Sequence, residues 1–154
     1  MKHFLLILLF FPIFLSAHTL KGKIVRVSDG DTVVLLDSTN TQHKIRLDGI
    51  DCPEKGQPFG RKATDFVKEL TTGKEIVVEW EKKDRYKRIL GVVYADGVNV
   101  NKELLKNGLA WHYKHFNQDK ELAELEQQAK DKKLNIWSEK NPIEPYQWRK
   151  GKRE

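Results

Sequence analysis

Three short runs rich in β-branched residues constrain the fold of this chain most strongly: Leu20–Val27, Thr32–Leu36 and His43–Leu47. Turn-forming residues separate them, with Asp-Gly after the first run and Asp-Ser-Thr-Asn after the second. Short apolar runs bounded by such turns are typical of strands that follow one another in a sheet. The first part of the chain therefore predicts a β-meander.

Two more strand-like runs lie further along, at Ile76–Trp80 and Ile89–Tyr94, and the charged segment Glu81–Lys87 connects them. We expect this connection to project into solvent as a mobile loop. Between the third and fourth runs, apolar residues at helical spacing predict a helix over Arg61–Leu70.

The last third of the chain changes to helical spacing, in two apolar groups: Val100, Leu104 and Leu105, then Leu122, Leu125 and Ala129. Each group forms one apolar face that must pack on a sheet. Five strands, a helix after the third strand and further helices at the end predict an α+β architecture, the five-stranded OB-fold barrel with three α-helices. An ordinary α+β sheet is the alternative.

The N-terminus has the pattern of a secretory signal peptide. A lysine precedes an unbroken apolar run from Phe4 to Leu15, and the small residues Ser16 and Ala17 follow. A membrane-spanning helix needs ~20 apolar residues, so we expect cleavage after Ala17, with retention of residues 1–17 as an anchor as the alternative. The protein would then be exported, secreted or periplasmic, without stable membrane association.

The rest of the chain is long enough for one domain with a core of its own. We expect that domain over residues 18–140, followed by a basic and aromatic tail over residues 141–154. Cys52 is the single cysteine and cannot form an internal disulfide, so the core alone must stabilise what we expect to be a monomer. The formal net charge of +6 favours a polyanionic partner, although a basic surface without one is equally compatible.

One segment concentrates residues capable of chemistry: Ile45-Arg46-Leu47-Asp48-Gly49-Ile50-Asp51-Cys52-Pro53-Glu54. Side chains alternate across a strand, so Ile45 and Leu47 are expected to face the core and Arg46 the opposite side. Asp51 and Glu54 can then approach Arg46 from the loop that follows. A structural salt-bridge network is the alternative interpretation of such a cluster.

Phosphodiester cleavage needs a cation near the phosphate, donors for its developing charge and a base for water. Asp31 and Asp51 offer the oxygen ligands that hard cations prefer, and the backbone carbonyl of Cys52 can add a third. Ca²⁺ tolerates an irregular shell better than Mg²⁺ does. The Cys52 thiol suits a hard cation poorly, and the Asp-Gly turn that carries Asp31 is by itself ordinary hairpin chemistry.

Arg46 and Arg88 carry planar donor forks that can each hold a phosphate with two hydrogen bonds. Donors fixed where transition-state charge accumulates typically contribute ~10²–10³ in rate. Glu54 is placed to orient or deprotonate the attacking water as a general base. Phosphodiester hydrolysis is therefore the leading hypothesis.

From about Lys21 to Ser138, the chain resembles the staphylococcal nuclease (thermonuclease) family of secreted nucleases. Its motifs occur in the family's order: Asp29-Gly30-Asp31-Thr32, the Arg46 to Glu54 segment, Asp84-Arg85-Tyr86-Lys87-Arg88, Tyr94-Ala95-Asp96-Gly97 and Leu134-Asn135-Ile136-Trp137-Ser138. No single motif is decisive, but their shared order is.

The resemblance implies an OB barrel and a calcium-dependent endonuclease of low sequence specificity. Its substrates would be DNA and RNA, with single strands preferred, and cleavage would leave 3′-phosphate ends. The resemblance also implies roles for particular residues: catalysis by Arg46, Glu54 and Arg88, and calcium binding by Asp31, Asp51 and the Cys52 carbonyl.

The resemblance is weaker where the nucleotide base would bind. Tyr86 matches a tyrosine that lines the nucleotide pocket, and Arg85 beside it is a further candidate for substrate binding. Where the staphylococcal enzyme has two tyrosines spaced by one residue, alignment places Lys114 and Phe116. Base stacking could continue through Phe116 or Tyr113.

Two other features could indicate binding sites, but we prefer interpretations without a binding role. His112 and His115 are three residues apart, but a structural zinc site usually needs four nitrogen or sulfur ligands, so we expect histidines at the surface or at a pocket rim. Residues 146–153 mix aromatic and basic side chains as single-strand binders do, with Trp148 as a candidate stacking platform. We expect a frayed, solvated end instead.

The rival functional hypothesis is an OB-fold module that binds nucleic acid or protein without cutting. Loss of catalytic residues would mark such a module. Here all the required positions carry suitable side chains, namely Asp31, Arg46, Asp51, Glu54 and Arg88. We therefore expect an enzyme.

Overall fold

The computed structural model describes residues 18–153. The predicted signal peptide, residues 1–17, lies outside this range. Within the described chain, none of the helices combines the length and the apolar composition that a membrane-spanning helix requires.

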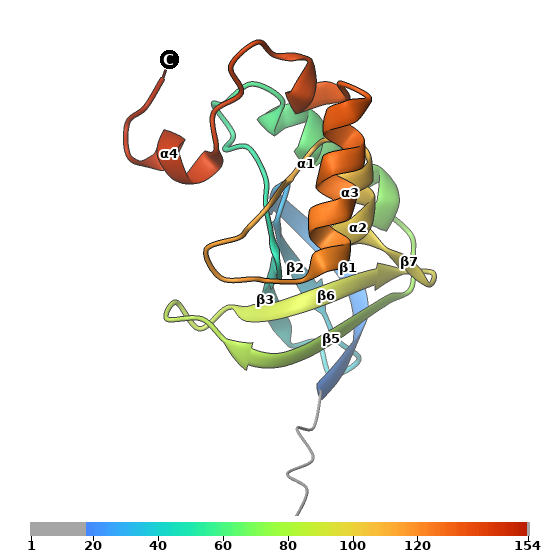
Figure 1. The fold of residues 1–154 in the computed structure, drawn as a ribbon. Coiled ribbons are helices and arrows are strands. Elements are labelled where there is room, and N and C mark those ends of the chain that lie inside the picture. Colours follow the sequence, from blue (N-terminus) through green and yellow to red (C-terminus); the bar gives the residue numbers. More distant parts are fainter. Residues whose placement is uncertain (1–17, 154) are drawn as a thin grey trace, which may run out of the picture.

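Five strands form a closed barrel (Figure 1): β1 (His18–Asp29), β2 (Thr32–Leu36), β3 (Gln42–Leu47), β5 (Ile76–Lys83) and β6 (Ile89–Ala95). They hydrogen-bond in the order β3-β2-β1-β5-β6, and a parallel pairing of β3 with β6 joins the two ends. The other ladders of the barrel are antiparallel. This closure confirms the predicted OB-fold barrel.

Two short pairings add to the barrel. β7 (Val98–Asn99) pairs with the end of β6, and β4 (Ile50–Asp51) pairs with β8 (Trp111–His112). Asp51 lies opposite Trp111 in the β4–β8 ladder. The backbone that carries this carboxylate is therefore held in a small sheet.

The three predicted helices are present and gather at one end of the barrel (Figure 1): α1 (Gly60–Thr71), α2 (Val100–Lys106) and α3 (Lys120–Asp131). A 3₁₀ turn, η1 (Asn135–Ser138), follows α3. A fourth helix, α4 (Pro145–Arg149), stands apart from the other three in Figure 1. It lies in the segment that we expected to be frayed, so the end of the chain is more ordered than its composition indicated.

β3 shows how the barrel combines a core with polar chemistry. Ile45 and Leu47 are 0% and 1% exposed, whereas Arg46 between them is only partly buried and points to the opposite side. Burying the two aliphatic side chains fixes the register of the strand, because a shift by one residue would exchange its two faces. The core therefore determines where Arg46 points.

Asn101 on α2 holds the loop that follows β3. Its side-chain N–H donates to the carbonyl of Asp48 at 2.9 Å, and its side-chain oxygen accepts the N–H of Val93 at 3.0 Å. A buried amide with donor and acceptor both satisfied favours a single backbone arrangement. The loop that leads to Asp51 consequently starts from a fixed point.

The hairpin formed by β5 and β6 is longer than the sequence predicted. β5 continues to Lys83, with a register shift between Trp80 and Lys82. A β-bulge of this kind lets a strand bend while its pairing continues. The exposed connection is therefore shortened to residues 84–88.

Glu126 on α3 is a buried acid that joins this helix to β8. Its side chain is 2% exposed, accepts the backbone N–H of His112 at 3.1 Å, and contacts the ammonium groups of Lys114 and Lys130, each at 2.8 Å. Burial alone would raise the pKa of Glu126, but hydrogen bonds from the two lysines outweigh it and lower the pKa below its ordinary value of 4.5. The charge of Glu126 thus stabilises the contact between α3 and β8.

Glu126→Gln should lower the free energy of unfolding by about 2 kcal/mol at neutral pH, because it removes the charge that the lysines and the amide surround. A depressed pKa in the folded state gives stabilisation that is present above the ordinary pKa and lost as the pH falls through the folded value. Urea denaturation should therefore show wild type and variant converging as the pH falls below 4.5, the ordinary pKa of a glutamate. Glu124→Gln, at an exposed position of the same helix, is the control, and a difference that persisted in acid would contradict the assignment.

Candidate active site

Asp31 lies in the turn between β1 and β2 and is 7% exposed. Its Oδ2 accepts the backbone N–H of Cys52 at 2.8 Å, and its Oδ1 accepts the hydroxyl of Thr32 at 3.2 Å. Asp31 and Cys52 are 21 residues apart in the chain. Their hydrogen bond therefore fastens the first turn of the barrel to the loop after β4.

Arg46 connects this turn to the neighbouring loop. Its Nη1 donates to the carbonyls of Leu47 and Ile50, each at 2.9 Å. Its Nη2 lies 2.9 Å from Asp51 Oδ1 and 3.2 Å from Asp31 Oδ2. One guanidinium thus closes the loop after β3 and bridges two carboxylates.

The two carboxylates converge, since an oxygen of each lies within 3.2 Å of the single atom Arg46 Nη2. Anionic oxygens of this kind suit a hard cation such as Ca²⁺. Among residues 18–153, no three His, Cys, Asp or Glu side chains come together as a metal-binding group. A cation here would therefore take carboxylate oxygens from Asp31 and Asp51 and complete its shell with a backbone carbonyl and water.

The thiol of Cys52 does not belong to that donor set. Cys52 is 3% exposed, and burial raises the pKa of its thiol well above the ordinary value, so the sulfur stays protonated. A neutral thiol is a poor ligand for a hard cation. The backbone of Cys52 is the part that contacts the site, because its N–H donates a hydrogen bond to the Asp31 carboxylate.

Glu54 lies on the loop between β4 and α1, at the edge of this cluster. Its backbone N–H donates to Gln57 Oε1 at 3.1 Å, which orders the loop. Its side chain is 37% exposed, and its Oε1 lies 2.7 Å from Nη1 of Arg149. The carboxylate is therefore open to water, as a general base must be.

Arg149, the last residue of α4, reaches the same acids from the end of the chain. Its Nη2 lies 2.9 Å from Asp51 Oδ2, and its Nη1 lies 3.2 Å from Asp51 Oδ1 as well as 2.7 Å from Glu54 Oε1. Arg149 was not among the site residues predicted from the sequence. Its signal was only the basic character of the tail, which does not distinguish one cation from its neighbours.

The side chain of Arg88 is directed elsewhere, because its Nε donates to Asp84 Oδ2 at 2.7 Å within the β5–β6 loop. Its position is nevertheless close to the cluster. In the parallel β3–β6 pair Arg46 lies opposite Leu90, two residues after Arg88. The structure therefore brings Asp31, Arg46 and Asp51 into direct contact, whereas the guanidinium of Arg88 contacts Asp84 in the β5–β6 loop.

Tyr86 and Arg85 lie in the same loop as Arg88. The ring of Tyr86 is 64% exposed, and the guanidinium carbons of Arg85 and Arg88 lie 4.8 Å and 5.5 Å from its centroid. An exposed ring flanked by cations offers a stacking surface for a base and charge for a phosphate. Both residues are compatible with the substrate-binding roles expected for them.

The remaining candidates lie on the loop after β8. Phe116 is 78% exposed and lies 4.9 Å from Tyr113, ring to ring, while the guanidinium of Arg46 lies 6.0 Å from the Tyr113 ring. Lys114 instead pairs with Glu126 at 2.8 Å. Tyr113 therefore connects the arginine to the exposed aromatic rim, whereas the charge of Lys114 pairs with Glu126 on α3.

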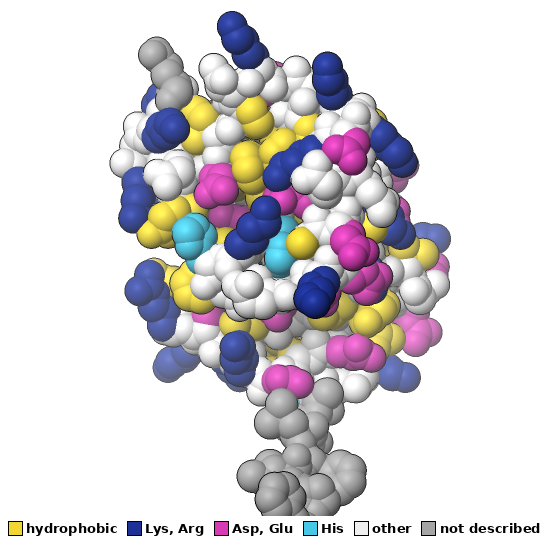
Figure 2. Space-filling view, viewed as in Figure 1, with side chains coloured by type: hydrophobic (Ala, Val, Ile, Leu, Met, Phe, Trp, Pro, Cys, Tyr) yellow, Lys and Arg dark blue, Asp and Glu magenta, His cyan; other side chains and the backbone are white. Residues whose placement is uncertain are grey.

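Figure 2 shows basic, acidic and histidine side chains intermixed on the face it draws.

His112, the last residue of β8, and His115, in the loop after it, have other partners. His112 is 6% exposed and its Nε2 lies 2.9 Å from Asn117 Oδ1, so it is more buried than the rim position we expected. The ring of His115 lies 4.9 Å from that of Tyr146. His115 therefore contacts the C-terminal segment rather than His112.

The acids of the cluster are crowded. Burial raises the pKa of Asp51 although hydrogen bonds and charge from Arg149 and Arg46 oppose it, and burial together with the charge of Asp31 raises the pKa of Asp29 to about 6. Partly buried carboxylates that lie close together favour the binding of a cation. The electrostatics of the cluster thus suit a divalent ion.

Comparison with known proteins agrees with this geometry. The family model described as "Staphylococcal nuclease homologue" matches residues 44–139, more than half of the chain. An Escherichia coli protein described as an "uncharacterized endonuclease" is 42% identical over 149 residues, covering 96% of this chain and 97% of its own. A "micrococcal nuclease" of Shigella flexneri is 37% identical over 141 residues, covering 84% of this chain and 80% of its own.

The Asp31 turn packs tightly against the Cys52 loop through a glycine. A Cβ atom on Gly30 would lie 2.8 Å from the Cβ atoms of both Cys52 and Ala63. By contrast, a Cβ atom on Gly56 would meet nothing within 4 Å. The absence of a side chain at Gly30 therefore lets the two parts of the site approach.

Gly30→Ala should destabilise the protein by ~1–3 kcal/mol, because overpacking forces the turn and the loop apart. Urea denaturation measures the loss, and Gly56→Ala is the matched control, for which we expect little change. Equal stabilities of the two variants would show that the turn can move without strain.

Proposed function

Because the chain belongs to the staphylococcal nuclease family, we propose that it is a calcium-dependent endonuclease that hydrolyses phosphodiester bonds of DNA and RNA with low sequence specificity. One observation carries the proposal: Asp31 and Asp51 converge beside the fixed guanidinium of Arg46. Two carboxylates beside a guanidinium suit a hard cation and a phosphate at the same site, which supports the proposal. The descriptions of two relatives as an endonuclease and a micrococcal nuclease support the reaction class.

Asp31, Asp51 and the backbone carbonyl of Cys52 would hold the calcium ion. Bound there, calcium would offset charge that develops on the phosphate and make water more acidic. Nη1 of Arg46 is bonded to two loop carbonyls and Nη2 contacts Asp31 and Asp51, so Arg46 would bind a phosphate oxygen through Nη2 once calcium binds these two acids.

Glu54 accepts a proton from the attacking water while the water oxygen bonds to phosphorus. The bond from phosphorus to the 5′ oxygen breaks, that oxygen takes a proton from solvent, and the products are a 3′-phosphate and a 5′-hydroxyl. Arg46 and Arg88 donate to the non-bridging oxygens, where negative charge increases. For this step Arg88 exchanges its carboxylate partner, Asp84, for the phosphate.

The substrate is proposed to be a single strand or a locally opened duplex. Exposed rings support this, since Tyr86 and Phe116 can stack only on bases that have left a helix. Arg85 adds a cation beside Tyr86. Lys114, held by the buried Glu126, would contribute less.

Export is part of the proposal and rests on the sequence. The apolar run from Phe4 to Leu15 and the small residues after it favour a cleaved signal peptide and a secreted or periplasmic protein. We propose that the mature enzyme acts as a monomer without stable membrane association.

The central test is cleavage of heat-denatured DNA with calcium and with a chelator. Wild type should cut only with calcium, and Glu54→Gln should lose ~10²-fold or more in kcat, because general-base catalysis typically contributes 10²–10⁴-fold. Glu69→Gln, at an exposed position of α1, is the control and should behave as wild type. Equal activity of wild type and Glu54→Gln without metal would disprove the mechanism.

The two arginines should act mainly on turnover. Arg46→Lys and Arg88→Lys should each lower kcat by ~10²-fold while KM changes little, because a lysine ammonium cannot reproduce the directed guanidinium donors that meet the phosphate in the transition state. Arg61→Lys, with a side chain 94% exposed, is the control. Circular dichroism checks folding, since Arg46 also holds two loop carbonyls. A change in KM alone would contradict a role of that arginine in the transition state.

A further inference from the structure

The C-terminal segment folds back onto the active site and places the positively charged side chain of Arg149 there. Arg149 approaches both oxygens of Asp51, at 2.9 Å and 3.2 Å, and one oxygen of Glu54, at 2.7 Å. The Asp51 side chain is 3% exposed, whereas that of Arg149 is 39% exposed. A buried carboxylate is therefore neutralised by a guanidinium at the surface.

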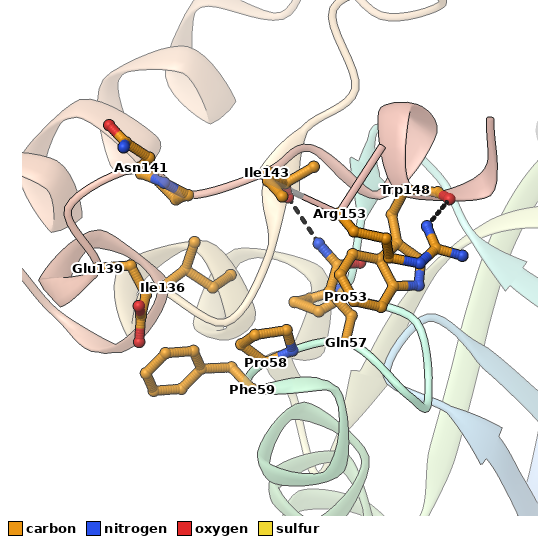
Figure 3. Close-up of a pocket in the computed structure, with 11 residues that line it drawn as sticks. Pro53, Gln57, Pro58, Phe59, Ile136, Glu139, Asn141, Ile143, Trp148 and Arg153 are labelled. Carbon is orange, nitrogen blue, oxygen red and sulfur yellow. Dashed lines mark hydrogen bonds between the residues drawn. The ribbon is translucent and has the colours of Figure 1, made fainter. Parts of the chain in front are cut away.

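Contacts on both sides of α4 hold this arrangement. The carbonyl of Ile143 accepts the side-chain N–H of Gln57 at 2.6 Å, as Figure 3 shows. Pro145, the first residue of α4, is buried, and the ring of Tyr146 lies 4.9 Å from that of His115. The segment is thus attached to the Glu54 loop and to the loop after β8, the two loops that flank the cluster.

The position of Arg149 conflicts with a bound metal ion. Arg46 contacts only one oxygen of Asp51, but Arg149 contacts both. Carboxylate oxygens are the ligands that calcium requires, and a second cation at the same oxygens would repel it. An arginine side chain stays protonated in proteins, so the guanidinium cannot avoid the conflict by losing its proton.

From these contacts we propose that Arg149 is a positioning residue that competes with calcium for Asp51, and thereby sets the calcium concentration at which the active site is assembled. This inference rests on the proposed calcium dependence. Without metal, Arg149 keeps Asp51 and Glu54 in place. Calcium binding displaces Arg149, α4 moves off the site, and Glu54 is released to act on water.

The strength of the contact fits such an exchange. An exposed ion pair contributes up to about 1 kcal/mol, and a geometry with two aligned bonds to a buried carboxylate contributes more. If the segment is closed in about nine molecules of ten, the apparent dissociation constant for calcium rises about tenfold, because the open fraction alone binds the ion. A contact of this strength can weaken calcium binding without preventing it.

The direct test is isothermal titration calorimetry of calcium chloride into the full-length mature protein without nucleic acid. Arg149→Ala should bind calcium about five- to tenfold more tightly than wild type, because the competing cation is absent. Lys152→Ala removes a positive charge from the same segment, and its side chain is exposed. This control should stay within about twofold of wild type, which separates direct competition from a general effect of charge.

Hydrogen exchange followed by mass spectrometry provides the second readout. In wild type, calcium should speed exchange of the backbone N–H groups of Trp148 and Lys150, whose acceptors lie within this segment. In Arg149→Ala these groups should exchange fast already without calcium. The β-strands of the barrel should show no such increase in either protein.

The outcomes separate the two proposals. Equal or weaker calcium binding by Arg149→Ala, or no calcium effect on exchange at α4, would overturn the competition while leaving calcium-dependent cleavage intact. Failure of all three proteins to bind calcium would overturn both the competition and the proposed metal. Tighter binding by Arg149→Ala together with calcium-induced exchange at α4 in wild type would support the inference.

Discussion

The guanidinium of Arg46 is the interaction on which the rest of the site depends. Asp31 comes from the turn between β1 and β2 and Asp51 from β4, and an oxygen of each lies within 3.2 Å of its Nη2. Its Nη1 closes the intervening loop through two backbone carbonyls. A lysine ammonium has no planar fork that could serve carbonyls on one side and carboxylates on the other. The same group therefore stabilises the loop, allows two acids to lie together and remains beside the place where a phosphate would bind.

The barrel determines where this guanidinium lies. Ile45 and Leu47 must be buried, so Arg46 has to point to the opposite side of β3. Closure of the barrel then pairs β3 with β6 in parallel and sets Arg46 opposite Leu90, which places the β5–β6 loop with Arg88 nearby. Backbone pairing of the strands therefore sets where Arg88 lies relative to Arg46, 42 positions earlier in the sequence, while the Arg88 side chain contacts Asp84.

These relations explain which features the sequence could predict. The alternation around Arg46, the turn residues between the strands and the helical spacing of apolar residues are local patterns, and they were sufficient to predict the barrel and its three main helices. The partner of Arg88 is also local, but Asp84 was assigned only as part of a motif. The ion pair of Lys114 with Glu126 depends on how α3 packs on β8, and the contact of Arg149 with Asp51 spans 98 positions. No short-range pattern encodes such contacts, because many lysines and arginines of the chain share the same local composition.

Charge balance links the active site to the C-terminal segment. Carboxylates that are buried well enough to hold a divalent ion are costly to keep without any cation. Arg46 compensates part of this charge permanently, since the loop carbonyls fix it in place. The remainder must come from a group that can leave when metal and substrate arrive, and a partly exposed arginine at the end of a short helix meets that requirement. The planar fork of Arg149 matches the two oxygens of Asp51, a match that the neighbouring Lys150 could not make. The electrostatic demand that suits this cluster to a metal ion therefore also accounts for the return of the chain's own C-terminus to the site.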